Sequence, residues 1–408
     1  MSPTRFVPHR RGWHWWSVLA LAVLVAGASG CSSAVPTPTP TKTPKPLETP
    51  TATWTPLPPT STPLPTATPI GAGLGTPTPE PVATPPAEPP TLPPDVCPLT
   101  GLPVEDPKVL ERPPLAIKVS NAPAIVRPQS GLSLADVVVE HYAEANLTRL
   151  TALYLSHDAE KVGPVRSGRQ IDLEIPAMFQ AIFACSGFAP GNIPLFQKSD
   201  FANRLIVRDP PWVHQAPFYV IPEAGKPQWH SLYTDTPGLW KWAADRGVSG
   251  RREVVGWAFA EEAPAGGEPA ESITLVYAPG IADAEYRYDA ARGLYVRFIL
   301  GEPHVEALTG EPLTAANVVV LQANHVETDI LEDQYDGGHY SIQIQLWGQG
   351  PGLVFRDGRA YPITWSRPER PDLVRFLDAA GRIFPLKPGN TWVQLVPLGH
   401  SVEYGRNP

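Results

Sequence analysis

The sequence predicts an α+β fold in two subdomains, an N-terminal mixed α/β sheet with a crossover helix and a C-terminal β-rich module. Three observations predict it. Runs of β-branched and aromatic residues alternate with helical segments as far as residue 247. Beyond residue 272 the apolar runs are short and are separated by turn residues. The folded length also exceeds what one hydrophobic core usually supports, so we expect domains at 95–262 and 271–405.

The chain is acidic and moderately apolar. Its 408 residues contain 32 Lys and Arg against 40 Asp and Glu, a net charge of −8, and 42% of them are hydrophobic. Because phosphate backbones are bound by basic surfaces, nucleic acid is excluded as a main partner. The sequence contains no P-loop, no Gly-x-Ser-x-Gly and no His-Glu-x-x-His. It therefore offers no familiar hydrolase signature, and we expect no cofactor.

The N-terminus has the three regions of an export signal. Arginines precede an apolar stretch, residues 13–28, which ends in Ala28-Ser29-Gly30-Cys31. These four residues are typical of a lipobox, and cleavage before Cys31 would leave a thiol for lipid attachment at the outer face of the cytoplasmic membrane. Residues 1–31 are thus predicted to be a lipoprotein signal peptide. An uncleaved anchor helix is the alternative, since the apolar stretch is nearly long enough to span a bilayer.

A linker rich in proline and threonine follows at residues 32–94. It contains 21 prolines between residues 34 and 94. Such a composition is too polar and too proline-restricted to form a core, and it favours polyproline II. We expect a disordered, semi-rigid spacer that holds the folded part away from the membrane, with a linker of no specific role as the alternative.

The N-terminal elements are predicted from apolar runs and the turns between them. Two strand-like runs, 137–142 and 150–155, flank Ala145-Asn146, and this arrangement predicts a hairpin or an adjacent strand pair. A loop with glycine and proline at 163–167 then leads into a helix-like run, which is followed by a strand at 182–185. The order strand, loop, helix, strand predicts a crossover unit.

A second helix and a series of strands complete the predicted fold. The helix begins at Thr236 and Pro237, a capping hydroxyl followed by proline in the first turn, and ends at Gly247. Asp357-Gly358 is the strongest hairpin signal, because this pair tolerates the positive φ angles of a tight turn. The later strands are predicted at 273–277, 285–288, 294–300, 318–322, 340–347 and 392–396.

Five short motifs are similar in order and spacing to those of a known family. They are Cys97-Pro98-Leu99-Thr100-Gly101, Arg127-Pro128-Gln129-Ser130-Gly131-Leu132, Thr148-Arg149, Gly163-Pro164-Val165-Arg166-Ser167-Gly168-Arg169 and Pro388-Gly389-Asn390-Thr391-Trp392. Over residues 97–398 the chain resembles the YerB-like lipoprotein family, which has N-terminal and C-terminal domains of unknown function. The resemblance implies a two-part α+β fold that is exported and lipid-anchored. It implies no established activity.

The chain departs from the family's pattern at two places. The family tends to have a histidine and a Gly-Gly-Ser-Pro turn after the central strand, where this chain has Cys185-Ser186-Gly187-Phe188-Ala189-Pro190. The family also tends to have alanine where this chain has Gly168. A role for that histidine is therefore not carried over, while Arg166 and Arg169 are both kept.

The best candidate for a functional site is the loop at 163–169 together with Arg149. A glycine-containing loop that runs into a helix offers backbone N–H groups and the positive end of the helix dipole, and Arg166 and Arg169 add bidentate donors. Phosphate or carboxylate fits such a site. The competing interpretation is that nearby carboxylates neutralise the arginines and only join strand to helix. The candidate ligand-binding residues are Arg149, Arg166, Arg169, Glu140, Glu144, Asp172, Arg127 and Gln129.

Three other groups allow alternative interpretations. His325, Glu327 and Asp329 share one face of an extended segment and predict a divalent-cation site, with a solvated strand edge as the competing interpretation. Cys97 and Cys185 form an even pair once Cys31 carries lipid, so a disulfide and two buried thiols are both compatible with the sequence. Tryptophans beyond the linker either fill the core or stack on sugars.

These observations favour a non-catalytic, membrane-tethered module. Its expected partners are the membrane, through lipid on Cys31, and an anionic cell-wall polymer, a lipid phosphate or another extracytoplasmic partner. An envelope-polymer enzyme, either a phosphotransferase or a hydrolase, is the first alternative. A structural scaffold is the second.

Overall fold

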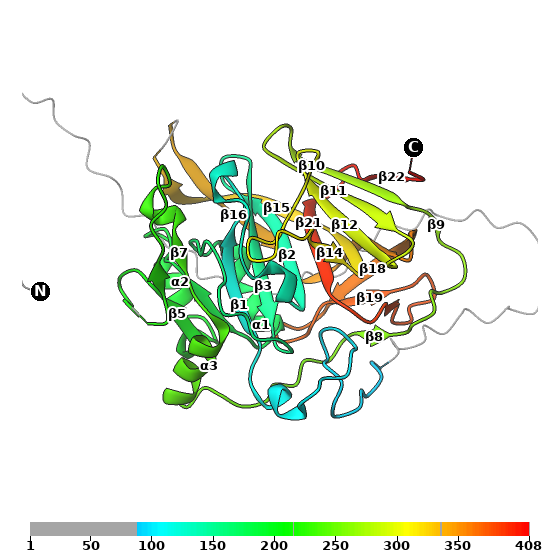
Figure 1. The fold of residues 1–408 in the computed structure, drawn as a ribbon, viewed down its shortest axis with the longest axis horizontal. Coiled ribbons are helices and arrows are strands. Elements are labelled where there is room, and N and C mark those ends of the chain that lie inside the picture. Colours follow the sequence, from blue (N-terminus) through cyan, green and yellow to red (C-terminus); the bar gives the residue numbers. More distant parts are fainter. Residues whose placement is uncertain (1–87, 215, 335–336, 408) are drawn as a thin grey trace, which may run out of the picture. The chain divides into compact units, whose positions relative to one another are not determined.

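The computed structural model describes residues 88–214, 216–334 and 337–407 (Figure 1). The predicted signal peptide, Cys31 and the linker up to residue 87 lie outside these residues. The described chain is rich in strands and has only short helices, so the predicted α+β class is confirmed. A search of the described helices finds none that is long and apolar enough to cross a bilayer.

A mixed sheet of twelve strands forms the centre of the fold. The strand order is β19-β18-β17-β15-β21-β2-β3-β1-β4-β5, with β16 paired to β15 and β9 paired to β18. The bounds of these strands are β1 Leu115–Ser120, β2 Val137–Ala143, β3 Leu147–Tyr154, β4 Ile182–Cys185, β5 Leu205–Val207, β9 Glu268–Pro269, β15 Asn317–Asp333, β16 His339–Gln345, β17 Gly348–Arg356, β18 Arg359–Arg367, β19 Arg375–Leu377 and β21 Thr391–Pro397.

Strand β21 joins the strands of the two predicted subdomains into this one sheet. It lies between β15 and β2 and is parallel to both, with Val393 opposite Val319 on one side and Val139 on the other. Parallel strands that are covered on both faces need apolar side chains at consecutive positions. The valine runs at 137–139 and 318–320 meet this need, and all six valines are buried.

A second sheet of six strands and two small pairs of strands complete the β structure. The six-stranded sheet has the order β13-β12-β11-β10-β22, with β14 paired to β12. Its bounds are β10 Ser272–Ala278, β11 Ala282–Asp289, β12 Leu294–Ile299, β13 Glu302–Pro303, β14 Thr314–Ala315 and β22 Glu403–Gly405. The small pairs are β6 Tyr219–Val220 with β7 Leu232–Tyr233, and β8 Ala258–Phe259 with β20 Pro385–Leu386.

The described helices are brief. The α-helices are α1 Ile175–Met178, α2 Ile193–Gln197 and α3 Thr236–Asp245, and the 3-10 helices are η1 Pro107–Glu111, η2 Ala124–Val126, η3 Leu132–Leu134, η4 Gln170–Leu173, η5 Ala202–Arg204 and η6 Gln228–His230. The predicted cap of α3 was one residue late, because the Asp235 carboxylate accepts a hydrogen bond from the Gly238 amide at 2.7 Å. The Thr236 hydroxyl instead accepts from the Ala159 amide at 2.8 Å.

Both predicted hairpins are present. Ala145 and Asn146 connect β2 to β3 with φ angles of 61° and 56°, and Asp357 and Gly358 connect β17 to β18 with φ angles of 53° and 69°. Positive φ at both central residues gives a turn whose twist matches that of the flanking strands. Gly358 is needed there, because an added Cβ would lie 2.9 Å from the Tyr288 ring.

The strand after the predicted crossover, β4, does not pair with β3, the strand before it. The chain passes from β3 through η4 and α1 into β4, as expected, but β4 pairs in parallel with β1, and β1 separates it from β3. Local patterns in the sequence identify strands but do not say which strand fills the place between them. The loop at 163–169 lies against the end of β1, because the Arg166 amide donates to the Lys118 carbonyl at 2.9 Å.

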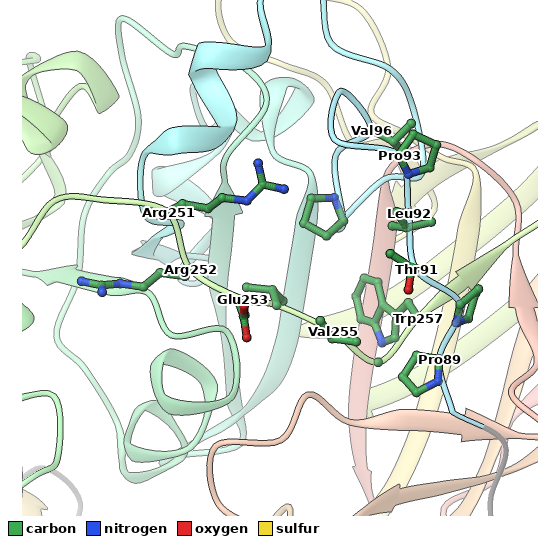
Figure 2. Close-up of a pocket in the computed structure, with 14 residues that line it drawn as sticks. Pro89, Thr91, Leu92, Pro93, Val96, Arg251, Arg252, Glu253, Val255 and Trp257 are labelled. Carbon is green, nitrogen blue, oxygen red and sulfur yellow. The ribbon is translucent and has the colours of Figure 1, made fainter.

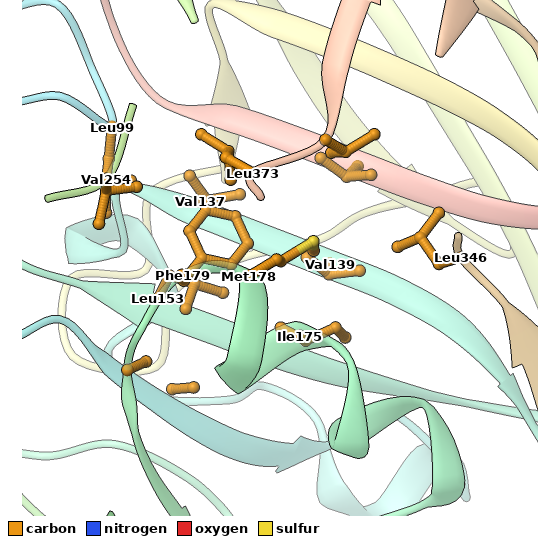
Figure 3. Close-up of a cluster of buried hydrophobic side chains, with 14 of the residues drawn as sticks. Leu99, Val137, Val139, Leu153, Ile175, Met178, Phe179, Val254, Leu346 and Leu373 are labelled. Atoms are coloured by element: carbon orange, nitrogen blue, oxygen red, sulfur yellow. The ribbon is translucent and has the colours of Figure 1, made fainter. Parts of the chain in front are cut away.

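Hydrophobic clusters cover both faces of the central sheet. On one face, Ile175, Met178 and Phe179 pack toward Val137 and Val139 (Figure 3). On the other face, the six-stranded sheet contributes buried side chains that include Leu275 and Tyr286, and these join Val138 and Trp392. Polar residues within the central strands are thus enclosed on whichever face they point to.

Candidate anion-binding site

The alternation of side chains along β1, β2 and β3 brings a group of polar residues to the face covered by η4 and α1. Arg149 of β3 lies opposite Ser120 of β1 and His141 of β2. Lys118 lies opposite Thr151, two residues farther along the same face. The group is continuous with the apolar cluster of Val137, Val139 and Leu153 on that face.

Lys118 is the centre of a closed network. Its ammonium, which is fully buried, donates to Asp172 and to the Thr151 hydroxyl, both at 2.9 Å, and contacts Nε2 of His141. Burial lowers the pKa of Lys118 to about 8 despite the attraction of Asp172. Burial and the adjacent Lys118 cation hold the pKa of His141 well below its usual value. The imidazole is thus neutral, so its Nε2 can accept from the lysine while Nδ1 donates to the Tyr142 carbonyl at 2.6 Å.

Both carboxylate oxygens of Asp172 already accept hydrogen bonds from other residues of the chain. One carboxylate oxygen accepts from Lys118 and from the Thr151 hydroxyl at 2.8 Å, and the other accepts from the Arg169 amide at 2.7 Å. The side chain is fully buried. Asp172 therefore fixes the start of η4 and neutralises Lys118.

Arg169 is neutralised by carboxylates, as the competing interpretation expected. Its Nε donates to Glu144, and its Nη1 lies 3.6 Å from Glu332. Glu332 comes from the far end of β15, and the Ser341 hydroxyl donates to it at 2.8 Å. Burial raises the pKa of Glu332, and the Arg169 cation opposes that rise.

Arg149 differs from Arg169 in having no carboxylate of its own. It is 4% exposed, it has no ion pair within the described parts of the chain, and its buried Nε has no hydrogen-bond partner there. Nη1 donates to the Thr148 carbonyl at 3.4 Å. Burial, followed by repulsion from Arg169 and Arg166, holds the pKa of Arg149 well below its usual value. A buried guanidinium N–H without an acceptor costs free energy, and a bound group that accepts a hydrogen bond from it would remove that cost.

His230, in η6, lies against the same cations and was not predicted from the sequence. It is 6% exposed, and its Nδ1 finds no hydrogen-bond partner among the residues described. Burial, and then the positive charges of Arg166, Arg149 and Lys226, lower its pKa to about 4. Arg149, Arg166 and His230 form what we call the cation cluster. The only hint in the sequence was a histidine beside a tryptophan in a proline-rich loop.

The cation cluster makes stability depend on pH through His230. The folded-state pKa of about 4 lies below the ordinary value of 6.5, so the unfolded chain binds more protons between these two pH values. The free energy of unfolding should therefore fall as the pH falls from 6.5 toward 4. We expect His230→Gln to lose less stability than the parent protein between pH 7 and pH 5 in urea titrations. Equal losses in the two proteins would contradict this placement of His230.

The other three candidate residues, Glu140, Gln129 and Arg127, lie on the face of the sheet opposite to η4 and α1. Glu140 is paired with the fully buried Arg297 at 2.7 Å, and it accepts from Asn121 and from the Thr148 hydroxyl, both at 2.9 Å. Gln129 donates to the Ser120 carbonyl at 2.9 Å. Arg127 lies near this group, since the charges of Arg297 and Glu140 both influence its pKa. The structure thus divides the eight candidates between two faces.

One contact connects Gly168 and Phe188, residues that belong to the two departures from the family pattern. A methyl group added at Gly168 would lie 2.5 Å from the Phe188 ring. Phe188 itself stacks on Phe196 at 3.9 Å between ring centroids and packs against the buried Phe183. The ring therefore occupies the space that alanine would need, and glycine at 168 accommodates it without moving Arg166 or Arg169.

The predicted cation-binding residues do not come together. A group of three His, Cys, Asp or Glu side chains placed to hold a metal ion is absent from the described ranges. The register of β15 against β16 shifts after Glu327, so the simple alternation that aligned His325, Glu327 and Asp329 is lost. His325 packs its ring edge to face with Tyr142, at 5.7 Å between centroids.

Cys97 and Cys185 are free thiols, both buried. Of the two alternatives that the sequence allowed, the disulfide is therefore not formed. Burial raises the pKa of Cys97 to about 12 and shifts the pKa of Cys185 in the same direction. Both thiols pack as small apolar groups.

The tryptophans are mostly core residues. Five of the eight beyond the linker are buried, namely Trp240, Trp242, Trp257, Trp365 and Trp392. Trp229 differs, with 64% of its side chain exposed, and it lies next to His230 in η6.

A pocket of about 340 Å³ lies away from the predicted site residues (Figure 2). Pro89 and Leu92 form one side, and Val255 and Trp257 form the other. At its edge Arg251 already pairs with Glu111 at 3.3 Å. The pocket marks where the end of the proline-rich sequence lies beside the segment 251–257.

Comparison with known proteins first identifies two domains of unknown function in this chain and then its family. Residues 99–249 match the N-terminal domain, and residues 273–393 the C-terminal domain, of a protein of unknown function (DUF3048). The chain is 32% identical to "Putative lipoprotein YerB" of Bacillus subtilis (strain 168) over 304 residues, which cover 74% of this chain and 86% of that protein. The chain therefore belongs to the YerB-like, DUF3048 family.

A solved structure supports the same assignment. The crystal structure of YerB protein from Bacillus subtilis superposes on this chain with a TM-score of 0.65 and 29% sequence identity. The superposed region covers 76% of this chain and 99% of the crystallised chain. The predicted family resemblance is therefore confirmed.

Proposed function

We propose that this chain is an exported, lipid-anchored and non-catalytic module that binds an anionic group of an envelope ligand at the cation cluster. The observation that carries the proposal is Arg149, a guanidinium that is 4% exposed and whose Nε has no hydrogen-bond partner among the residues that the structure describes. Glu144 and Glu332, whose charges act on Arg149, are already contacted by Arg169. An external anion would supply the missing acceptor and offset the mutual repulsion of Arg149, Arg166 and Arg169.

Phosphate is the anion that best suits this arrangement. Its oxygens can accept from two guanidinium groups at once, and a protonated His230 could donate a further hydrogen bond. Phosphate bound at the cluster would raise the pKa of His230, which the cations now lower. A lipid anchor on Cys31, as in a lipoprotein, would place the site among the phosphate-bearing polymers and lipids of the envelope.

The carboxylates support binding over catalysis. Asp172 is held by Lys118, Thr151 and the Arg169 amide, and Glu140 is held by Arg297 and two further donors. Both side chains are buried and each oxygen already accepts from at least one donor of the chain, so neither presents an exposed position to a substrate. A general acid or base needs such a position, within hydrogen-bond reach of the proton it moves.

Calorimetric titration with inorganic phosphate tests the proposal. Replacing Arg166, which is less buried than Arg149, by glutamine should weaken phosphate binding about tenfold or more, since one charge-assisted hydrogen bond contributes about 1.5 to 3 kcal/mol. Arg287→Gln is the matched control, because Arg287 is surface-exposed and paired with Glu285 far from the cluster. It should bind like the parent protein.

Two results of this titration would count against the proposal. Equal affinity of Arg166→Gln and Arg287→Gln would remove Arg166 from the site. A lower melting temperature of Arg166→Gln with no change in phosphate affinity would favour a structural scaffold. Where binding is found, titrations with soluble glycerol phosphate and with vesicles of anionic phospholipid would separate a polymer from a lipid as the source of the phosphate.

A further inference from the structure

A second pocket, on the other face of the central sheet, has features of a separate binding site. It measures about 320 Å³ and lies between the loop of Arg127 and the β12–β13 hairpin. Its walls are largely apolar. The residues that line it are Arg127, Pro128, Ile299, Leu300, Glu302, Pro303, His304 and Val305.

Arg127 is the cation of this pocket and lacks an anionic partner. Its buried Nη1 has no hydrogen-bond partner, and no carboxylate of the described chain lies within ion-pair distance of its guanidinium. Burial, and next the charge of Arg297, lower its pKa. Glu140 attracts Arg127 from a distance, but both of its oxygens already accept from Arg297, Asn121 and Thr148.

The other polar groups of the pocket leave Arg127 as the donor available to a ligand. His304 accepts from Nε of Arg297 at 3.0 Å through Nδ1, so its Nε2 carries the proton that bonds Gln129 at 2.7 Å. Burial and the charges of Arg297 and Arg127 hold the pKa of His304 well below its usual value, and the ring stays neutral. Glu302 is exposed at the rim.

Leu300 is held at the rim in an unfavourable backbone conformation. Its φ is 53°, in the left-handed region where glycine or asparagine costs less, and the residue is 37% exposed. A turn that needed only the backbone would be more stable with one of those residues. A leucine at this position adds apolar surface to the wall of the pocket.

We propose that this pocket binds a small apolar monocarboxylate, with Arg127 pairing to the carboxylate and Ile299, Leu300 and Val305 contacting the alkyl chain. A monocarboxylate supplies two acceptors for one guanidinium, and its tail matches the apolar side chains that make up most of the walls. At about 30 Å³ per water-sized group, the pocket holds a tail of about ten heavy atoms. The site is independent of the cation cluster and of the function proposed for it.

Calorimetric titration of the folded chain with octanoate and with octanamide tests this proposal. The two probes share a tail and differ in charge. We expect octanoate to bind about tenfold or more tightly than octanamide, and Arg127→Gln to remove that difference. Leu300→Asn, which suits a positive φ, should weaken both probes and keep the preference for the carboxylate. Arg149→Gln should leave octanoate binding unchanged.

Three outcomes would overturn the proposal. They are the absence of octanoate binding at millimolar concentration, equal binding of octanoate and octanamide by the parent protein, and an unchanged preference in Arg127→Gln. Loss of octanoate binding in Arg149→Gln would also contradict it, because the anion would then occupy the cation cluster. A circular dichroism spectrum and a melting curve of each variant exclude unfolding as the cause.

Discussion

Asp172→Asn should lower the free energy of unfolding by about 3 to 5 kcal/mol, because breaking a buried ion pair by removing one partner leaves an uncompensated charge. Lys118 and Asp172 have fully buried side chains 2.7 Å apart. Asparagine keeps the shape but cannot neutralise the ammonium, and its amide N–H₂ would face a donor in either orientation, Lys118 and Thr151 in one and the Arg169 amide in the other. Urea denaturation at pH 7 measures the change.

Asp158→Asn is the matched control for this experiment. Asp158 pairs with Arg112 at 2.7 Å, the same distance, but its side chain is 57% exposed. Exposed ion pairs contribute little, so a change of about 1 kcal/mol or less is expected. A loss in Asp172→Asn no larger than in Asp158→Asn would show that Lys118 is not held as a buried cation.

Arg149→Met should have the opposite effect on stability. In phosphate-free buffer we expect the free energy of unfolding to rise by about 1 to 3 kcal/mol, because methionine fills much of the space of the arginine stem and removes a buried, unsatisfied cation. The repulsion between Arg149 and its neighbours Arg166 and Arg169 disappears at the same time. Phosphate should stabilise the parent protein and no longer stabilise this variant.

Arg367→Met provides the comparison for this result. Arg367 is also buried, but it pairs with Glu174 at 2.6 Å and donates to the carbonyls of Leu346 and Asp372. The same substitution there should lower the free energy of unfolding by about 3 kcal/mol or more. If Arg149→Met destabilised the chain as Arg367→Met does, Arg149 would be a structural residue and the proposed anion site would be wrong.

Local features of the fold could be predicted because they depend on neighbouring residues. The turns at Ala145-Asn146 and Asp357-Gly358 need residues that adopt positive φ, and the strand at 182–185 is an unbroken apolar run. The insertion of β21 between β15 and β2 could not be predicted. It depends on parallel pairing between segments more than 250 residues apart, and an apolar run does not specify its neighbour.

The candidate site could be predicted only in part, because only some of its residues are close to one another in the sequence. Arg149, Arg166 and Arg169 stand near one another in sequence around one strand and one loop, and Arg149 and Arg166 do reach the same cluster. Glu140 and Glu144 are four residues apart, yet they lie in different networks, because Glu140 lies within β2 and pairs with Arg297, while β2 ends at Ala143 and Glu144 in the following turn pairs with Arg169. His230 arrives from a loop far along the chain, and no local pattern indicates its neighbours.

The most direct test of the anion site is a crystal structure of the chain soaked in tungstate, a heavy analogue of phosphate whose position is seen by anomalous scattering. The proposal predicts a peak within hydrogen-bond distance of Arg149 and Arg166, with His230 beside it, and no such peak in crystals of Arg149→Met. Tungstate bound elsewhere while the cluster stays empty in the parent protein would contradict the proposed function.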